Sequence, residues 1–331
     1  MTAAPLFIQS IGLASPLGLT ADSSYAAHRA KMDRFQTLPY RDDAGGALTG
    51  SCLESLGEPR AAKDRWLPLL CHAVRDALRG LPADRDAVFI LALPAGATLD
   101  DARALWEEHG VPESQRRLCS GGPFAGHQAI STARALLTEG RAPAVLVAGA
   151  DSLINARALL PWSQDRRLLT EENSDGILPG EAAAALMFHR RRGPLGSIVG
   201  MGVAQEPSLV TNDIPLKAQG LVTAARAALG EAGLAMHDLD VRLSDASGEA
   251  FHFKEQTLLV LRMLRRNKDS FPLWRSASSL GYCGAATALC DLVMALSAAK
   301  MSRFPGRRAI ACAGDDQGRR GALILDLQAS R

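Results

Sequence analysis

Two uninterrupted apolar runs constrain the fold of this chain more than any other feature. They are residues 87–93 (AVFILAL) and 144–150 (AVLVAGA), with helical patterns between them at 98–109 and 124–138. A strand that is apolar on both faces has to be covered on both faces, as happens in a parallel sheet between helices. Residues 182–189 (AAAALMFH) have the same character and are expected to return to this sheet. The pattern predicts an α/β fold.

The chain opens with a strand, a turn and a helix. Residues 6–14 (LFIQSIGLA) are typical of a buried strand, Ser15–Gly18 of a turn, and Thr20 is the expected N-cap of the helix. The segment 38–58 carries many Gly, Asp, Ser and Pro residues, which predicts an exposed loop or flap. A helix over 61–79 is expected to follow it.

The second half of the chain repeats this scheme. Ala148–Asp151 (AGAD) closes one predicted strand and Ala313–Asp316 (AGDD) closes its counterpart, which supports an internal duplication. Arg190–Pro194 is the expected junction, so the predicted halves are residues 1–192 and 193–331. The elements expected in the second half are strands 195–204, 239–244, 309–313 and 322–327 and helices 218–232, 252–266 and 284–300.

Composition excludes several classes of function. Lys and Arg total 37 against 35 Asp and Glu, and a formal charge of +2 gives no strong attraction to nucleic acid or to an anionic membrane. The 6 Cys residues form no CxxC pair, which predicts reduced thiols and no metal or other cofactor. The N-terminus lacks the pattern of a signal peptide, and no apolar run reaches the roughly 18 residues of a membrane span. We expect a cytoplasmic protein.

Three motifs resemble the β-ketoacyl synthases of the thiolase fold. They are Ile11–Gly18 (IGLASPLG), Val147–Ser152 (VAGADS) and Asp175–Ala184 (DGILPGEAAA). The resemblance spans nearly the whole chain, although 331 residues are fewer than in a typical elongating ketosynthase. It implies a thiolase-like αβαβα fold of two similar βα halves with pseudo-twofold symmetry. It also implies a homodimer joined through edge strands.

The resemblance places the family's nucleophilic cysteine at Pro123. Ketosynthases carry that cysteine at a sharp turn before a helix, and the Gly and the Ala-Ile pair that follow it match Gly126 and Ala129–Ile130. Proline has no nucleophilic atom, and it lacks the backbone N–H that in the family is one of the two oxyanion donors. Cys119 is expected within the preceding strand, as a small core residue and not as a replacement nucleophile.

The two family histidines are replaced as well. The His-Gly-Thr-Gly-Thr pattern aligns with Ser244–Glu249, which puts Asp245 at the first histidine, and the Lys-Ser-x-x-Gly-His pattern puts Tyr282 at the second. The family's glycine-rich loop matches Gly314–Gly321, where charged residues replace an apolar gate. An ionised Asp has the wrong charge to stabilise the oxyanions of condensation. We therefore predict no catalytic residues and no condensing activity.

Residues around these three positions are the candidate pocket, with alternatives that the sequence leaves open. Asp245, Glu249, His252 and Tyr282 could perform hydrolysis, or Asp245 and Ser247 could cap the following helix while Glu249 forms an exposed ion pair. The Arg pairs at 116–117, 166–167, 265–266 and 319–320 could grip a phosphopantetheine arm or an acidic protein, or be solvated. The candidate pocket residues are Cys119, Phe124, Glu249, Cys283, Asp315 and Asp316.

These interpretations favour a binding function over an enzymatic one. Short ketosynthase-like proteins of this kind resemble those encoded in type VI secretion clusters, which implies an adaptor or chaperone for a secretion effector. The alternative is acyl-thioester handling without condensation, either as a chain-length-factor-like partner of an active ketosynthase and its acyl carrier protein or as an acyl hydrolase. Pro123 argues against the hydrolase. Both leading hypotheses require a protein partner.

Overall fold

Ten of the described strands form one continuous sheet, and its two five-stranded halves, which we call the first and the second sheet, meet where β1 pairs with β8. The structure, a computed structural model, describes residues 4–57, 63–82, 86–190 and 193–327. The first sheet has the order β5-β4-β6-β7-β1 and the second has the order β10-β9-β11-β12-β8. The strands are β1 Leu6–Ala14, β4 Val88–Leu93, β5 Arg116–Ser120, β6 Ala144–Ser152, β7 Glu181–His189, β8 Gly196–Gln205, β9 Val241–Ser244, β10 Leu273–Trp274, β11 Arg308–Gly314 and β12 Arg319–Leu327.

The pairing directions repeat between the halves, as the predicted duplication requires. In the first sheet β4, β5 and β6 are parallel and β7 runs antiparallel to β6 and β1. In the second sheet β9, β10 and β11 are parallel and β12 runs antiparallel to β11 and β8. A short antiparallel pairing of Leu6–Ile8 with Gly196–Ile198 joins the sheets.

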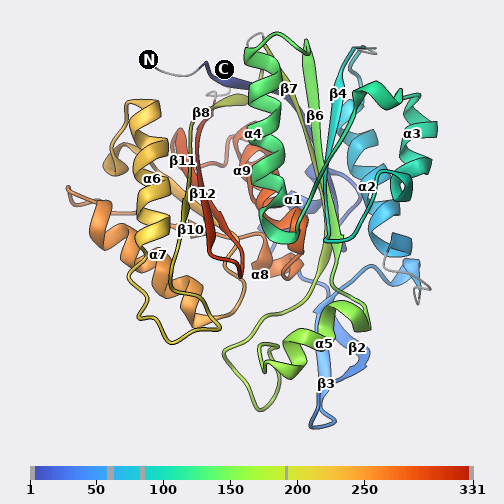
Figure 1. The fold of residues 1–331 in the computed structure, drawn as a ribbon, viewed down its shortest axis with the longest axis vertical. Coiled ribbons are helices and arrows are strands. Elements are labelled where there is room, and N and C mark those ends of the chain that lie inside the picture. Colours follow the sequence, from blue (N-terminus) through green and yellow to red (C-terminus); the bar gives the residue numbers. More distant parts are fainter. Residues whose placement is uncertain (1–3, 58–62, 83–85, 191–192, 328–331) are drawn as a thin grey trace.

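Helices form three layers around the two sheets (Figure 1). The central layer, α4 and α9, packs in one apolar core with Val145 and Val147 of β6 and with Leu323 of β12. The outer faces are covered by α2 and α3 on the first sheet and by α6 and α7 on the second. The helices are α1 Ala21–Arg29, α2 Lys63–Leu78, α3 Arg103–His109, α4 Ala125–Thr138, α5 Ala156–Gln164, α6 Gln219–Ala232, α7 Ala250–Met263, α8 Ala277–Leu280 and α9 Thr287–Lys300.

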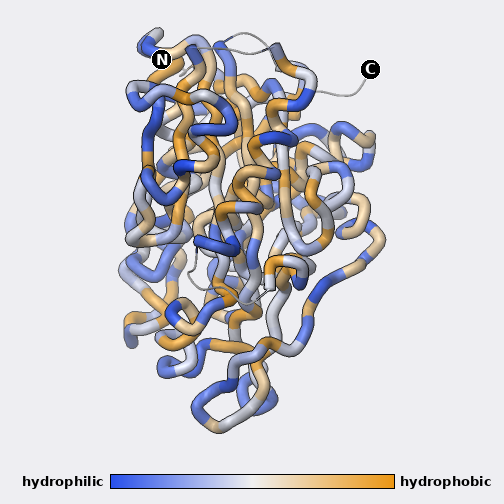
Figure 2. The backbone as a smooth tube through the Cα atoms, turned by 90° about the vertical axis from the view of Figure 1, so that its right-hand side faces the viewer, coloured by the Kyte–Doolittle hydropathy of each residue, from blue (hydrophilic) through white to orange (hydrophobic). Residues whose placement is uncertain are grey.

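Successive side chains of the central strands point to opposite faces of the sheet, and this explains the αβαβα arrangement. Leu146 and Ala148 of β6 face the outer core, while Val145 and Val147 face the central one, so both faces of the strand are buried. Figure 2 shows hydrophobic residues along these strands and hydrophilic ones in many of the turns. The predicted strand and helix scheme is confirmed, with Thr20 as the N-cap of α1. Within the described residues no helix could cross a bilayer.

Two glycines at equivalent places let an outer helix approach each sheet closely. A Cβ at Gly12 of β1 would lie 2.0 Å from the backbone oxygen of Ala73 in α2, and a Cβ at Gly200 of β8 would lie 2.1 Å from that of Ala228 in α6. Such distances are far inside van der Waals contact, so only glycine fits. The same close approach in both halves reflects the pseudo-twofold symmetry.

The exposed loop or flap predicted over 38–58 is a strand hairpin as far as residue 51, and residue 58 lies outside the described residues. The chain there forms a hairpin of β2 (Phe35–Arg41) and β3 (Ala47–Ser51), which projects beside α5 at the lower end of Figure 1. Leu38 and Leu48 of the hairpin pack with Ile154 and Leu159 in a separate small core. Contacts far apart in sequence therefore stabilise a segment whose composition is typical of a loop. The expected junction at Arg190–Pro194 includes residues 191–192, which lie outside the described residues, so the boundary between the halves stays a prediction.

Candidate functional site

Pro123 lies in a tight turn at the start of the central helix α4. Gly121 and Gly122 before it have φ angles of +149° and +75°, which glycine adopts readily, and Gly122–Phe124 form one turn of 3₁₀ helix. The sequence Ser-Gly-Gly-Pro thus builds the sharp strand-to-helix bend that the resemblance predicts. The position next to the helix N-terminus, which favours anions, is occupied by a residue without N–H or nucleophile.

The structure brings Asp245 and Tyr282 together near this turn. Asp245 follows β9, and the backbone N–H of Gly314 donates to its Oδ2 at 2.7 Å. Burial raises the pKa of the Asp245 carboxyl. The ring of Tyr282 contacts Trp162 at a centroid distance of 5.8 Å, and burial raises the pKa of its phenol well above the ordinary value. These two side chains therefore present neutral or anionic groups at the positions to which the resemblance assigns imidazoles.

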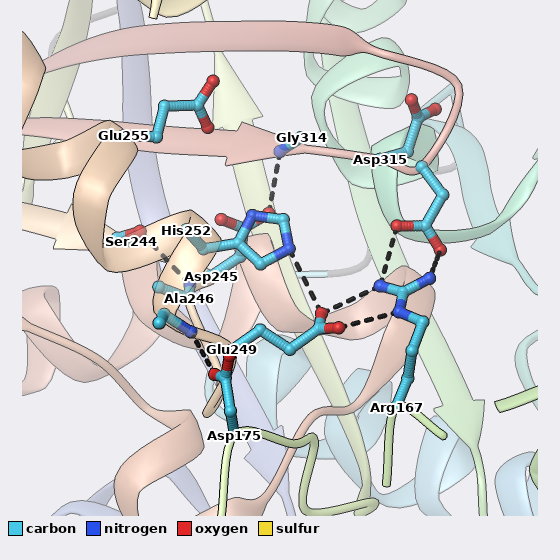
Figure 3. A network of polar contacts seen from close by, with 12 residues as sticks. Arg167, Asp175, Ser244, Asp245, Ala246, Glu249, His252, Glu255, Gly314 and Asp315 are labelled. Atoms are coloured by element: carbon cyan, nitrogen blue, oxygen red, sulfur yellow. Dashed lines mark hydrogen bonds and ion pairs between the residues drawn. The ribbon is translucent and has the colours of Figure 1, made fainter. Parts of the chain in front are cut away.

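An ion-pair network lies beside Asp245 (Figure 3), and its residues line the same small cavity as Tyr282. The Arg167 guanidinium donates to both carboxylate oxygens of Glu249, at 2.7 and 2.8 Å, and to those of Asp316, at 2.8 and 3.0 Å. Burial acts to raise the pKa of Glu249, but the hydrogen bonds and charges of Arg167 and His252 outweigh it and lower that pKa to about 2. The His252 Nε2 lies 3.5 Å from Glu249 Oε2. The network joins the segment after α5 to α7 and to the loop after β11.

The charged loop between β11 and β12 is fixed to the Pro123 turn. The Asp315 carboxylate accepts from the Arg319 Nε at 2.6 Å and from the Arg319 and Gln317 backbone N–H groups. Arg319 in turn donates to the backbone oxygen of Gly121 at 3.2 Å, and its guanidinium lies 5.1 Å from the ring centroid of Phe124. Arg319 therefore connects this loop to the Pro123 turn.

The space left at this site is small. The cavity beside Asp245 has a volume of about 20 Å³, which is room for about one water molecule. A shallow groove of about 450 Å³ lies on the other side of Tyr282 and includes Pro123, Trp162 and Asp151. Burial raises the pKa of Asp151 to about 7, although it accepts backbone hydrogen bonds from Ser152 and Ala285.

The candidate pocket residues separate into two groups. Glu249, Asp315 and Asp316 line the small cavity with Asp245 and Tyr282. Cys119, Phe124 and Cys283 do not: each is buried, and burial raises the pKa of both thiols. These three were expected in the pocket because they are near its residues in sequence, but they face the core or pack against neighbouring side chains.

Two further sequence interpretations can be compared with the geometry. Glu249 forms a buried ion pair with Arg167 and not an exposed one. Arg167 is the central residue of the site, and the sequence signalled it only as one member of an Arg pair. Within the described residues, no group of His, Cys, Asp and Glu side chains is placed to hold a metal ion.

Comparison with known proteins supports this description of the fold. No protein-family model matches the chain. A Schizosaccharomyces pombe protein named "Putative 3-oxoacyl-[acyl-carrier-protein] synthase, mitochondrial" is 27% identical over 200 residues, which cover 53% of this chain and 47% of that protein. The chain thus matches about half the length of this relative.

Solved structures of ketosynthases superpose on nearly the whole chain. A ketosynthase in complex with its chain length factor from Xenorhabdus doucetiae matches with a TM-score of 0.78, 15% identity and 98% coverage of both chains. The oxazolomycin ketosynthase domain of Streptomyces albus gives 0.82 at 13% identity, covering 99% of this chain and 76% of that one. A β-ketoacyl synthase of Burkholderia phymatum gives 0.77 at 15% identity, covering 98% and 100%. The chain therefore has the thiolase-like fold of the ketosynthases.

Proposed function

We propose that this chain is a non-condensing ketosynthase-like protein that binds an active β-ketoacyl synthase, in the manner of a chain-length factor. The observation that carries the proposal is Pro123 at the turn before α4, the position to which the resemblance assigns the attacking cysteine. Proline supplies no sulfur to form an acyl-enzyme bond and no N–H to stabilise the oxyanion.

The rest of the site supports the absence of condensation. Asp245 and Tyr282 cannot supply the two imidazole donors, and the Arg167 ion pairs occupy the neighbouring space. The cavity of about 20 Å³ beside Asp245 is far below the roughly 300 Å³ at which ligand pockets begin. The groove of about 450 Å³ at Pro123 is above that size, but Pro123 offers a thioester no nucleophile.

An open sheet edge is the surface that we assign to the partner. Among the described strands, β5 pairs only with β4, so its other edge is free. Arg117 and Ser120 of β5 are exposed, and the shallow groove beside Pro123 and Trp162 adjoins the end of this strand. A free edge offers backbone N–H and C=O groups for pairing with a second chain. The proposal therefore joins β5 to a strand of the ketosynthase.

This interpretation is favoured by the comparison with the Xenorhabdus complex, because that structure contains a ketosynthase with its chain length factor. A homodimer through the same β5 edge would use the same surface and would compete with the ketosynthase. No contact in the structure specifically favours a type VI secretion effector as the partner.

Co-expression tests the partner. The tagged chain would be expressed with the ketosynthase and acyl carrier protein of its native host, and the complex measured by size-exclusion chromatography with light scattering. We expect a one-to-one complex that Arg117→Glu combined with Ser120→Glu weakens at least about tenfold, because carboxylates would crowd the edge. The matched control is Arg226→Glu on α6, an exposed arginine on the outer helix of the second half.

The outcomes separate the candidate functions. A homodimer that excludes the ketosynthase would contradict the proposal. A stable complex with a secretion effector in place of the ketosynthase would also contradict it and would support the adaptor or chaperone function.

A second experiment tests the assignment of the site. Pro123→Cys should not restore condensation of an acyl thioester with malonyl-carrier protein, because Asp245 and Tyr282 remain. Condensation by this single variant would show that those two positions do not limit the chemistry.

A further inference from the structure

The first half has a second cavity, at the opposite end of its sheet from the Pro123 turn. Ala87 and Phe89, at the start of β4, line this cavity, whereas residues 94–97, after the end of β4, line the groove beside Pro123. A strand of 6 residues spans roughly 20 Å. The cavity has a volume of about 600 Å³, so it is larger than that groove and separate from it.

The lining of this cavity is mostly apolar. Leu81 follows α2, Val111 follows α3, and Met187 belongs to β7. Among the described lining residues none carries a charge at neutral pH, and the polar side chains are those of His109 and Gln115. Protein interiors leave few voids larger than a water molecule, and a volume of about 600 Å³ lies in the range of small-molecule sites.

The corresponding space in the second half holds a phenylalanine. β10 takes the place of β5 in the repeated strand order, so the segment before β10 corresponds to the segment before β5. There Phe271 packs against the apolar core that α6 and α7 share, and Arg242 and Lys268 lie 5.2 and 5.3 Å from its ring centroid. The segment before β5 instead brings Pro112 and Gln115 to an open cavity. The two halves therefore differ at this place, although their strand order is the same.

His109 supplies a polar group that the rest of the fold does not use. Burial lowers the pKa of its imidazole, so the ring is neutral near pH 7. Its Nε2 is buried without a hydrogen-bond partner among the described residues and lies 3.7 Å from Glu108 Oε1, which is too far for a hydrogen bond. The nearby carboxylate favours a proton on Nε2, and Nδ1 is then an acceptor. Gln115, by contrast, already interacts with another residue.

We propose that this cavity binds an uncharged apolar molecule with one hydroxyl group, which donates a hydrogen bond to the His109 imidazole. Among the described lining residues no charged side chain is present to pair with an ionised ligand, and burying an unpaired charge is costly. The Glu108 carboxylate beside the ring would also repel an anion. The inference does not rest on the proposed ketosynthase partner, because neither Pro123 nor the exposed β5 residues line this cavity.

Competition with a fluorescent dye tests the class of ligand. The probe is N-phenyl-1-naphthylamine, an uncharged dye that fluoresces in apolar surroundings, and the full chain should bind it saturably at one site. The alcohol 1-octanol should displace it, whereas octanoate and octylammonium at pH 7 should require at least about tenfold higher concentrations. His109→Phe should weaken 1-octanol about fivefold, as expected for one hydrogen bond. It should leave 1-chlorooctane, which has no hydroxyl group, within about twofold.

Variants that fill the cavity test its location. Ala87→Leu fills it from β4, and Leu81→Trp fills it from the half-buried rim. Each should weaken 1-octanol at least about tenfold, and the rim variant keeps the test available if the buried substitution prevents folding, which circular dichroism shows. The matched control is Ala158→Trp, which fills the groove beside Pro123 and should leave binding within about twofold.

Several results would overturn the proposal. Loss of binding in Ala158→Trp but not in Leu81→Trp would place the ligand in the groove beside Pro123. Displacement by octanoate or octylammonium as effective as by 1-octanol would contradict the uncharged class. Equal effects of His109→Phe on 1-octanol and 1-chlorooctane would contradict the hydrogen bond, and the absence of saturable binding would contradict the site itself.

Discussion

Replacing Arg167 with methionine removes the central cation of the site and leaves its carboxylate partner buried. The side chain of Glu249 is 5% exposed and lies 2.7 Å from the Arg167 Nε. Breaking a buried pair from one side costs about 3–5 kcal/mol. The pKa of Glu249 points the same way: burial raises it, but Arg167 and His252 together lower it from 4.5 to about 2.

The pH dependence of this stability loss tests whether the buried Glu249 carboxylate causes it. Because the folded pKa of Glu249 is depressed, its contribution to stability is present above pH 4.5 and is lost as the pH falls toward about 2. Thermal unfolding should show Arg167→Met about 5 °C below the wild type at pH 7, with a smaller difference at pH 3. Asp316→Asn is the control, because the Asp316 side chain is 42% exposed and its pair should contribute less than about 1 kcal/mol. A cost of Arg167→Met below 1 kcal/mol, or one equal at both pH values, would refute the reasoning.

Three other predictions concern the buried polar groups and the close helix contacts. Arg65→Met should destabilise the fold by about 3–5 kcal/mol, because Glu181 is fully buried and Arg65 lies 2.6 Å from it; chemical denaturation measures the loss. Burial raises the pKa of Asp291 to about 8 and that of Asp151 to about 7, so wild-type stability should fall as the pH rises from about 4 to 8. Asp291→Asn should reduce that decline in unfolding measured across this range, and Asp151 should account for part of what remains. Gly200→Ala should destabilise the fold by at least about 2 kcal/mol, because the new Cβ would lie 2.1 Å from the backbone oxygen of Ala228 in α6. Gly230→Ala, whose Cβ would have nothing within 4 Å, should stabilise the fold by about 0.5–1 kcal/mol. Equal changes in the free energy of unfolding for the two variants would show that the sheet and helix adjust freely.

The elements that the sequence predicted well are those whose burial is visible locally. The runs 87–93 and 144–150 are apolar throughout and correspond to β4 and β6. Both faces of these strands are buried, so each strand appears in the sequence as an uninterrupted apolar run. Cys119 was expected within a strand and lies in β5. The pseudo-twofold arrangement followed from the repeat of these elements.

The elements that the sequence could not predict depend on distant partners. The hairpin over Phe35–Ser51 has a loop-like composition, and contacts with Ile154 and Leu159 stabilise it. The network around Arg167 joins residues 82 and 149 positions away, so no local spacing could indicate it. Position in the sequence likewise suggested Cys283 as a pocket residue, whereas its buried thiol donates to the backbone oxygen of Gly281 at 3.4 Å.

The central claim is that this site forms no acyl-enzyme. The most direct measurement is the intact mass of the protein after incubation with acyl-CoA and with acyl carrier protein charged with the same acyl group. The account predicts an unchanged mass, because Pro123 has no nucleophile and the thiols of Cys119 and Cys283 are buried with raised pKa values. A stoichiometric acyl adduct on either cysteine would contradict it.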